Sequence, residues 1–194
     1  VERKYENALN NYLLSFNILS LNNIHDINLF DACMNIGIIY AIMSRFDLAY
    51  DYFGNANKVL TNSSIEKHPE DIASFYSNYG AFTYKMGKIN ESNIYYERAD
   101  SALKNIQTQT HYQRAGIYLN KGNNSYSELD FSAALLNYNK AISLYLLSDS
   151  YKGSDIARCY NNLSAVSLKL RKYKESEDYC IKGLTYNPEI FLKI

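Results

Sequence analysis

The chain has 194 residues, 47% of them apolar, and its 20 basic residues are balanced by 20 acidic ones. That balance leaves no basic stripe, so the sequence lacks the electrostatic footprint of a nucleic-acid-binding surface. It also contains no apolar run long enough to span a bilayer. We therefore expect one elongated domain, residues 1–194, that contacts neither nucleic acid nor a membrane directly.

The first half of the chain reads as helices separated by short turns. Apolar spacing predicts a helix over 3–21, and Asp26 is a suitable N-cap for the next helix, which should end near residue 44. The partner of that helix is expected over 46–60. Pro69 then fits the first turn of another helix, where its missing N–H costs nothing.

The second half continues with outgoing and returning helices of similar length. Gly87 marks one turn, and Gly153 combines a helix stop with the start signal of the following Ser154 and Asp155. The last three helices are predicted over 131–147, 155–169 and 173–186.

One short block returns four times and organises these helices. It is an asparagine, a larger residue and a glycine or serine: Asn35-Ile36-Gly37, Asn78-Tyr79-Gly80, Asn120-Lys121-Gly122 and Asn162-Leu163-Ser164. A bulky column follows at a constant offset: Phe46, Ile89, Phe131 and Tyr173. Then come a small column (Ala49, Ser92, Ala134, Ser176), a mostly aromatic column (Phe53, Tyr96, Tyr138, Cys180) and a second small column (Ala56, Ala99, Ala141, Gly183). The blocks are 42 or 43 residues apart, and a repeat of this length indicates a solenoid.

The glycine of the block has a physical meaning. Inside a helix it costs about 1 kcal/mol relative to alanine, yet three of the four blocks carry it. We expect it to permit close approach of the next helix, with the first small column as its counterpart and the bulky column beside the contact. The offsets of three, four and three residues describe one face of a helix.

These columns resemble the tetratricopeptide repeat. The aromatic residue early in that family's first helix is matched by Tyr76, Tyr118 and Tyr160, with Cys33 in the first full repeat, and its late proline by Pro188. The period resembles the longer repeats of kinesin light chains and bacterial peptide-pheromone receptors. The resemblance implies an all-α fold, a right-handed α-solenoid of antiparallel helix pairs.

The repeat boundaries follow from the period. Residues 1–22 are expected to be the second helix of a truncated repeat, since Tyr5 and Ala8 fall in the bulky and small columns. Complete repeats are predicted over 26–61, 69–106, 109–148 and 154–188, and 189–194 as the start of a further helix. We therefore expect a fragment of a larger bacterial protein, cytoplasmic or periplasmic, that self-associates through its ends.

No catalytic or metal-binding grouping stands out. Cys33, Cys159 and Cys180 form no CxxC pair, and the first and last fall in the apolar columns, so we interpret them as core residues. The three histidines show no metal-like spacing. The sequence also has no phosphate loop or nucleophile motif. We expect no cofactor, no metal and no enzymatic activity.

The resemblance implies that the first helix of each pair lines a concave groove that binds a protein or an extended peptide. The expected groove residues are Asn35, Asn78, Asn120 and Asn162, with Asn123, Arg158, Ser74, Tyr84 and Tyr126 beside them. An asparagine amide is both donor and acceptor, so a row of them can bind a peptide backbone. The alternative, that each amide bonds to a neighbouring helix, stays open. Two other hypotheses stay open. The chain is a ligand-sensing input region of a bacterial transcriptional regulator or sensor kinase, or it is a purely structural scaffold.

Overall fold

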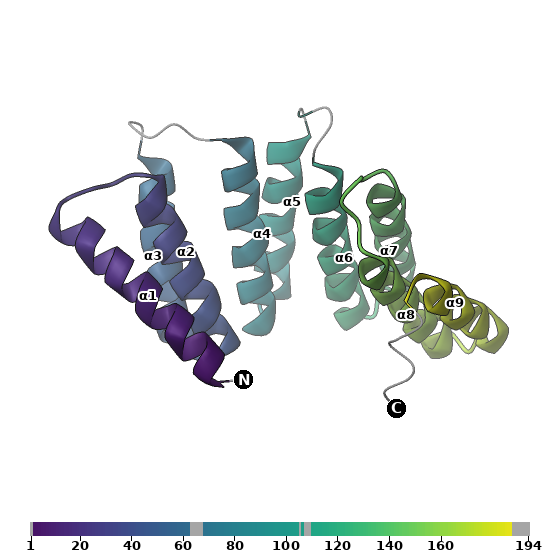
Figure 1. Ribbon diagram of the computed structural model, residues 1–194. Coiled ribbons are helices and arrows are strands. Elements are labelled where there is room, and N and C mark those ends of the chain that lie inside the picture. The colour runs from purple at the N-terminus through teal and green to yellow at the C-terminus, as the bar shows by residue number, and fades with distance from the viewer. Residues whose placement is uncertain (1, 63–67, 105, 107–109, 188–194) are drawn as a thin grey trace. The chain divides into compact units, whose positions relative to one another are not determined.

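The computed structural model describes residues 2–62, 68–104, 106 and 110–187, and within these ranges it contains nine α-helices and no strand (Figure 1). The expected all-α fold is therefore confirmed. The helices of the first unit, Val1–Ala102, are α1 (Glu2–Leu21), α2 (Ile27–Ile42), α3 (Phe46–Thr61), α4 (Pro69–Lys85) and α5 (Ile89–Leu103). Those of the second unit, Leu103–Ile194, are α6 (His111–Ser127), α7 (Phe131–Leu146), α8 (Gly153–Lys169) and α9 (Tyr173–Tyr186). The helix predicted over 189–194, and Pro188 before it, lie outside the described residues.

The helix starts in the first unit follow local chemistry. Asp26 caps α2, because its carboxylate accepts hydrogen bonds from the backbone N–H groups of Asn28 and Leu29 at 3.0 and 3.1 Å. The side-chain hydrogen bond from Asn28 is the main cause that lowers the pKa of Asp26. Pro69 is the first residue of α4, as its fixed φ predicts.

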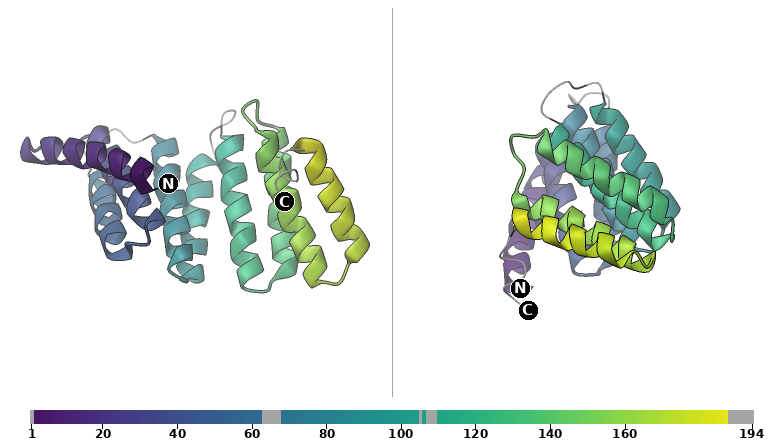
Figure 2. Two further views of the ribbon diagram at one scale, coloured as in Figure 1. Left: turned by 60° about the horizontal axis from the view of Figure 1, so that its bottom comes forward. Right: turned by 90° about the vertical axis from the view of Figure 1, so that its right-hand side faces the viewer.

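Antiparallel neighbours build each unit (Figure 2). In the first unit α3 packs against α2, α4 contacts both, and α1 packs on α2, where Tyr5 and Tyr12 lie against the buried core. In the second unit α6 packs against α7 and α8 against α9, with α7 contacting α8. None of the helices in the described ranges is both long and apolar enough to cross a membrane.

The turn inside each helix pair has one conformation. Its left-handed residue is Ser44, Gly87, Leu129 or Arg171, with φ of 58°, 75°, 62° and 58°. In every case the next N–H donates to the carbonyl five residues back at 2.9 Å, as Arg45 does to Tyr40. This is the Schellman end of a helix, in which a left-handed residue lets two N–H groups satisfy the last carbonyls. Of these four residues only Gly87 is of a type that indicates a left-handed conformation from the sequence alone.

The glycine of the repeated block lies under an aromatic ring. A Cβ added to Gly37 would lie 3.2 Å from the ring of Phe53, and one added to Gly80 would lie 2.9 Å from that of Tyr96. Tyr138 covers Gly122 in the same way. The aromatic column, not the small column alone, therefore occupies the space that the glycine leaves.

In the second repeat the residue of the small column is Ser92, and its side chain contacts the helix that carries Gly80. The hydroxyl of Ser92 donates to the carbonyl of Gly80 at 2.8 Å, and both residues are buried. In the fourth repeat both positions of this contact differ. Ser164 replaces the glycine of the other blocks, and Cys180 replaces the aromatic residue that covers it. The Ser164 hydroxyl lies 3.1 Å from the Cys180 sulfur and 2.7 Å from the Ser176 hydroxyl.

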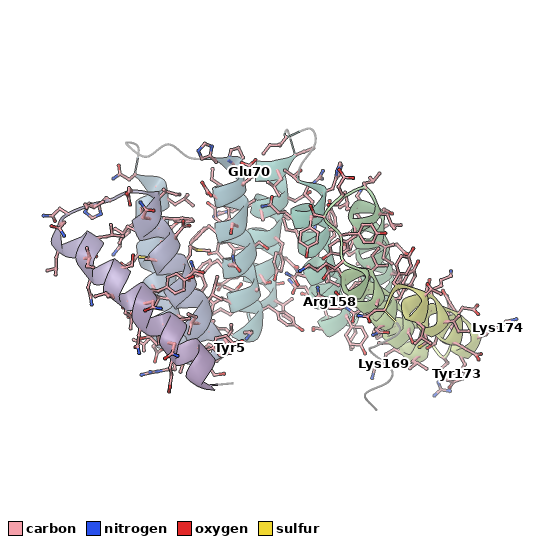
Figure 3. All side chains as sticks on the ribbon, viewed as in Figure 1. Tyr5, Glu70, Arg158, Lys169, Tyr173 and Lys174 are labelled. Atoms are coloured by element: carbon pink, nitrogen blue, oxygen red, sulfur yellow. The ribbon has the colours of Figure 1, made fainter. Side chains whose placement is uncertain are left out.

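The bulky column is not uniformly buried. Phe46 and Phe131 contact other rings, Phe82 at 6.2 Å and Tyr126 at 5.8 Å between centroids. Tyr173, the fourth member, is 66% exposed and is the first residue of α9, beside Lys174 (Figure 3). The expectation that it fills a gap beside the close contact of its repeat is wrong, because most of its side chain is exposed to solvent.

Candidate interaction surfaces

The asparagine column (Asn35, Asn78, Asn120 and Asn162) has one arrangement in the first unit. The Asn35 amide donates to the carbonyl of Asp31 at 2.8 Å, and the Asn78 amide donates to that of Ser74 at 2.9 Å. Both side chains are half-buried, Ser74 is exposed, and their helices α2 and α4 contact each other. Each amide is thus held in the same orientation by its own helix. The Asn78 amide nitrogen also lies 3.5 Å from the Ser74 hydroxyl. The oxygen of each amide, and the second N–H of Asn35, can still bond to another molecule.

The second unit treats the column differently. The Asn162 amide donates to the side-chain oxygen of Asn123 at 3.1 Å, and the Tyr138 hydroxyl donates to that same oxygen at 3.0 Å. Asn123 thereby links α6, α7 and α8, so here the asparagine bonds to a neighbouring helix. Asn120 is half-buried on α6.

Arg158, labelled in Figure 3, lies in the first turns of α8 and belongs to a small polar network there. Its guanidinium donates to one carboxylate oxygen of Asp155 at 2.8 Å, and the Tyr112 hydroxyl donates to the other at 2.9 Å. The Asp155 side chain is 11% exposed and that of Arg158 is 58% exposed. The hydrogen bond to Asp155 raises the pKa of Tyr112, and burial raises that of Tyr145. The exposed side of Arg158 can bind a partner while Asp155 keeps it in place.

Tyr84 and Tyr126 are the remaining expected groove residues. Both are half-buried, Tyr84 near the end of α4 and Tyr126 near the end of α6. Tyr126 packs edge-on against Phe131. Tyr84 belongs to the first unit and Tyr126 to the second.

Sequence reasoning did not predict a pocket of about 200 Å³ in the first unit, which we term the aromatic pocket. It lies between α3, α4 and α5, and its lining includes Tyr50, Gly54, Tyr76, Tyr79, Tyr95 and Arg98. The guanidinium of Arg98 lies over the rings of Tyr76 and Tyr95, 5.5 and 5.7 Å from their centroids. Two features could have drawn attention to it: the 20 tyrosines, and a helical glycine outside the repeated block.

Comparison with solved structures supports the fold that the columns predicted. The chain superimposes on BtubC (BKLC) from P. vanneervenii with a TM-score of 0.74 at 17% identity, over 84% of this chain and 65% of that one. Against the APC/C hetero-tetramer Cut9-Hcn1 the TM-score is 0.70 at 17% identity, over 96% of this chain and 31% of that one. Against MamA the TM-score is 0.66 at 16% identity, over 97% of this chain and 91% of that one.

All three are tetratricopeptide-type helical solenoids, and the chain has that fold. It spans less than two thirds of the length of the first two. No protein-family sequence model matches the chain, and no curated protein sequence matches it. The fold is typical of modules that hold other proteins.

Proposed function

We propose that the chain is a non-catalytic interaction module that binds extended peptide segments of other proteins along Asn35 and Asn78, the part of the asparagine column that lies in the first unit. The observation that carries this proposal is the repeated geometry of Asn35 and Asn78. Two asparagines on contacting helices make the same bond to their own backbone.

The pitch of the helices suits an extended chain. Packed helices lie about 8–10 Å apart, and three residues of extended chain span about 10 Å. The amides of Asn35 on α2 and Asn78 on α4 would therefore meet peptide groups about three residues apart. Binding through the peptide backbone alone would discriminate little between partners with different side chains.

Alanine substitutions at Asn35 and Asn78 test the proposal. Peptides would be selected against the whole chain from a displayed library of unstructured sequences, and their Kd measured by fluorescence anisotropy. Each substitution should weaken binding by about 1–3 kcal/mol, or about 5–150-fold, with little change in Tm. Asn139→Ala is the matched control, because Asn139 makes the same bond to the carbonyl of Leu135, at 2.8 Å, on the exposed side of α7.

Two results would contradict this assignment. One is a set of selected peptides that bind both variants as tightly as the original chain. The other is a loss of stability at Asn35→Ala or Asn78→Ala as large as the loss of affinity, which would make the column structural.

The setting of the module is a separate hypothesis. We propose the predicted repeats, 26–61, 69–106, 109–148 and 154–188, as its binding units, with self-association through the ends measurable by light scattering. The roles as input region of a bacterial transcriptional regulator or sensor kinase, or as a scaffold, are distinguished by the flanking reading frame. A membrane helix or an output domain beside this segment would favour the sensor.

A further inference from the structure

The aromatic pocket lies on a different side of α4 from the asparagine column. Tyr76 precedes Asn78 by two residues, which places it about 200° around the helix. Tyr79, one residue after Asn78, and Phe75 also line the pocket from α4, and the Tyr79 ring lies 4.7 Å from that of Tyr95 between centroids. A ligand in this pocket would therefore not compete for the amide edge of Asn78.

Gly54 leaves part of this pocket open. It stands in the interior of α3, and apart from its chain neighbours and the adjacent backbone of its own helix no atom lies within 4 Å of a Cβ built on it. A helix-interior glycine costs about 1 kcal/mol relative to alanine. At Gly37 the ring of Phe53 explains that cost, but at Gly54 no packing contact does. What the glycine preserves at this position is space.

The wall opposite carries a cation and phenols. Arg98 is exposed and its contacts in the described part of the chain are with the rings of Tyr76 and Tyr95, not with a carboxylate. A guanidinium supported on aromatic faces keeps its fork of donors available for a planar anion. Burial raises the pKa of Tyr79 to about 12, so its phenol stays neutral at physiological pH.

The size of the pocket limits its occupant. At about 200 Å³ it is smaller than the roughly 300–1,000 Å³ of sites that enclose drug-sized ligands. It can enclose about one aromatic side chain, for which ring faces and edges are suitable partners. A single arginine at the wall matches a single carboxylate, since the two groups form paired hydrogen bonds.

We propose that the aromatic pocket binds an aromatic side chain of a partner protein that has a carboxylate next to it, with the ring beside Gly54 and the carboxylate on Arg98. This second site rests on the proposed role as an interaction module but not on the asparagine column. It would add side-chain specificity to a surface that otherwise binds backbone.

Capped hexapeptides are suitable probes: acetyl-Gly-Ser-Phe-Glu-Ser-Gly-amide, and its variants with Phe replaced by Ala or Glu by Gln. Their Kd for the whole chain would be measured by chemical-shift titration. The Phe-Glu peptide should bind about tenfold or more tightly than either variant, which is the scale of a charge-assisted hydrogen bond. Gly54→Leu, which fills the pocket, should remove the preference for Phe over Ala, and Arg98→Gln should remove the preference for Glu over Gln.

Stability separates pocket filling from damage. Gly54→Leu replaces a glycine by a strong helix former in open space, so its Tm should be equal to or above that of the original chain. Arg98→Gln changes an exposed residue and serves as the second, independent variant. Asn35→Ala and Asn78→Ala should leave binding of the Phe-Glu peptide unchanged.

The outcomes distinguish the two sites. Equal affinity of the three peptides, no titration of the Phe-Glu peptide up to its solubility, or undiminished binding by Gly54→Leu would overturn the pocket assignment. Loss of Phe-Glu binding in the asparagine variants would show that the probe occupies the asparagine column instead. Selected extended peptides that depend on Asn35 and Asn78, with no preference for Phe-Glu, would support only the proposed function.

Discussion

The contact between Gly80 and Tyr96 allows a quantitative test of the repeat. In Gly80→Ala the new Cβ would lie 2.9 Å from Cε1 of the Tyr96 ring, closer than carbon atoms pack. Tyr96 is 1% exposed, so the ring cannot swing into solvent. Overpacking of this kind costs about 1–3 kcal/mol, while the gain in helix propensity is about 1 kcal/mol. We expect a net loss of about 0–2 kcal/mol in the free energy of unfolding.

Removal of the ring should reverse the sign. In a Tyr96→Cys background, which copies the pairing of Ser164 with Cys180, the added methyl group meets no ring and only the propensity gain remains. Gly80→Ala should then stabilise the chain by about 1 kcal/mol. The coupling energy between the two sites is therefore about 1–3 kcal/mol, well within what contacting residues show. Gly54→Ala, which meets no atom within 4 Å, should stabilise by the same amount in both backgrounds.

The four chains of this cycle would be unfolded in guanidinium chloride under reducing conditions. Far-UV circular dichroism is the appropriate signal, because the sequence has no tryptophan. Equal m values are required before the midpoints are compared. An effect of Gly80→Ala that is the same with and without the Tyr96 ring would refute the idea that the aromatic column determines the need for glycine.

Three further predictions concern turns, buried polar groups and pH. Leu129→Gly should raise the free energy of unfolding by about 0.5–1 kcal/mol in the same denaturant assay, because the left-handed φ of 62° strains leucine; an unchanged midpoint would contradict the turn geometry. Asp155→Ala should lower it by about 1–3 kcal/mol, since the Tyr112 hydroxyl loses its acceptor, and Tyr112→Phe should lower it less. Burial raises the pKa of Tyr79 to about 12 and of Cys33 to about 11, from 10.0 and 9.0. Both groups stay protonated in the folded chain while the unfolded chain ionises. The free energy of unfolding should therefore be at its full value below pH 9 and fall as the pH rises to about 12. A free energy of unfolding that does not change between these pH values would show that both groups are solvated.

The sequence by itself determined the helices and their pairing. Apolar residues at offsets of three and four define one face of a helix, and a period of 42 or 43 residues leaves room for two helices and two turns. Asp26 and Pro69 marked helix starts correctly, because capping and a fixed φ act within a few residues of the chain. Such signals are local, so one sequence suffices to detect them.

The candidate binding residues were only partly determined in this way. The period placed Asn78 and Asn162 at equivalent positions, but it could not show which atoms each amide would meet. Asn78 bonds to its own helix, whereas Asn162 bonds to Asn123 on another. The difference depends on what the adjacent helix presents at that point, and no residue within the block encodes it.

Only the tertiary structure decided the contacts that join different helices. The ring of Tyr96 packs against Gly80. Leu129 has a left-handed conformation although it is not a glycine. Gly54 and Arg98 line the same pocket. A repeat period determines which residues share a face of one helix. The distance between two helices and the rotamers that fill it depend on every side chain at the contact together, and these become defined only when the helices pack.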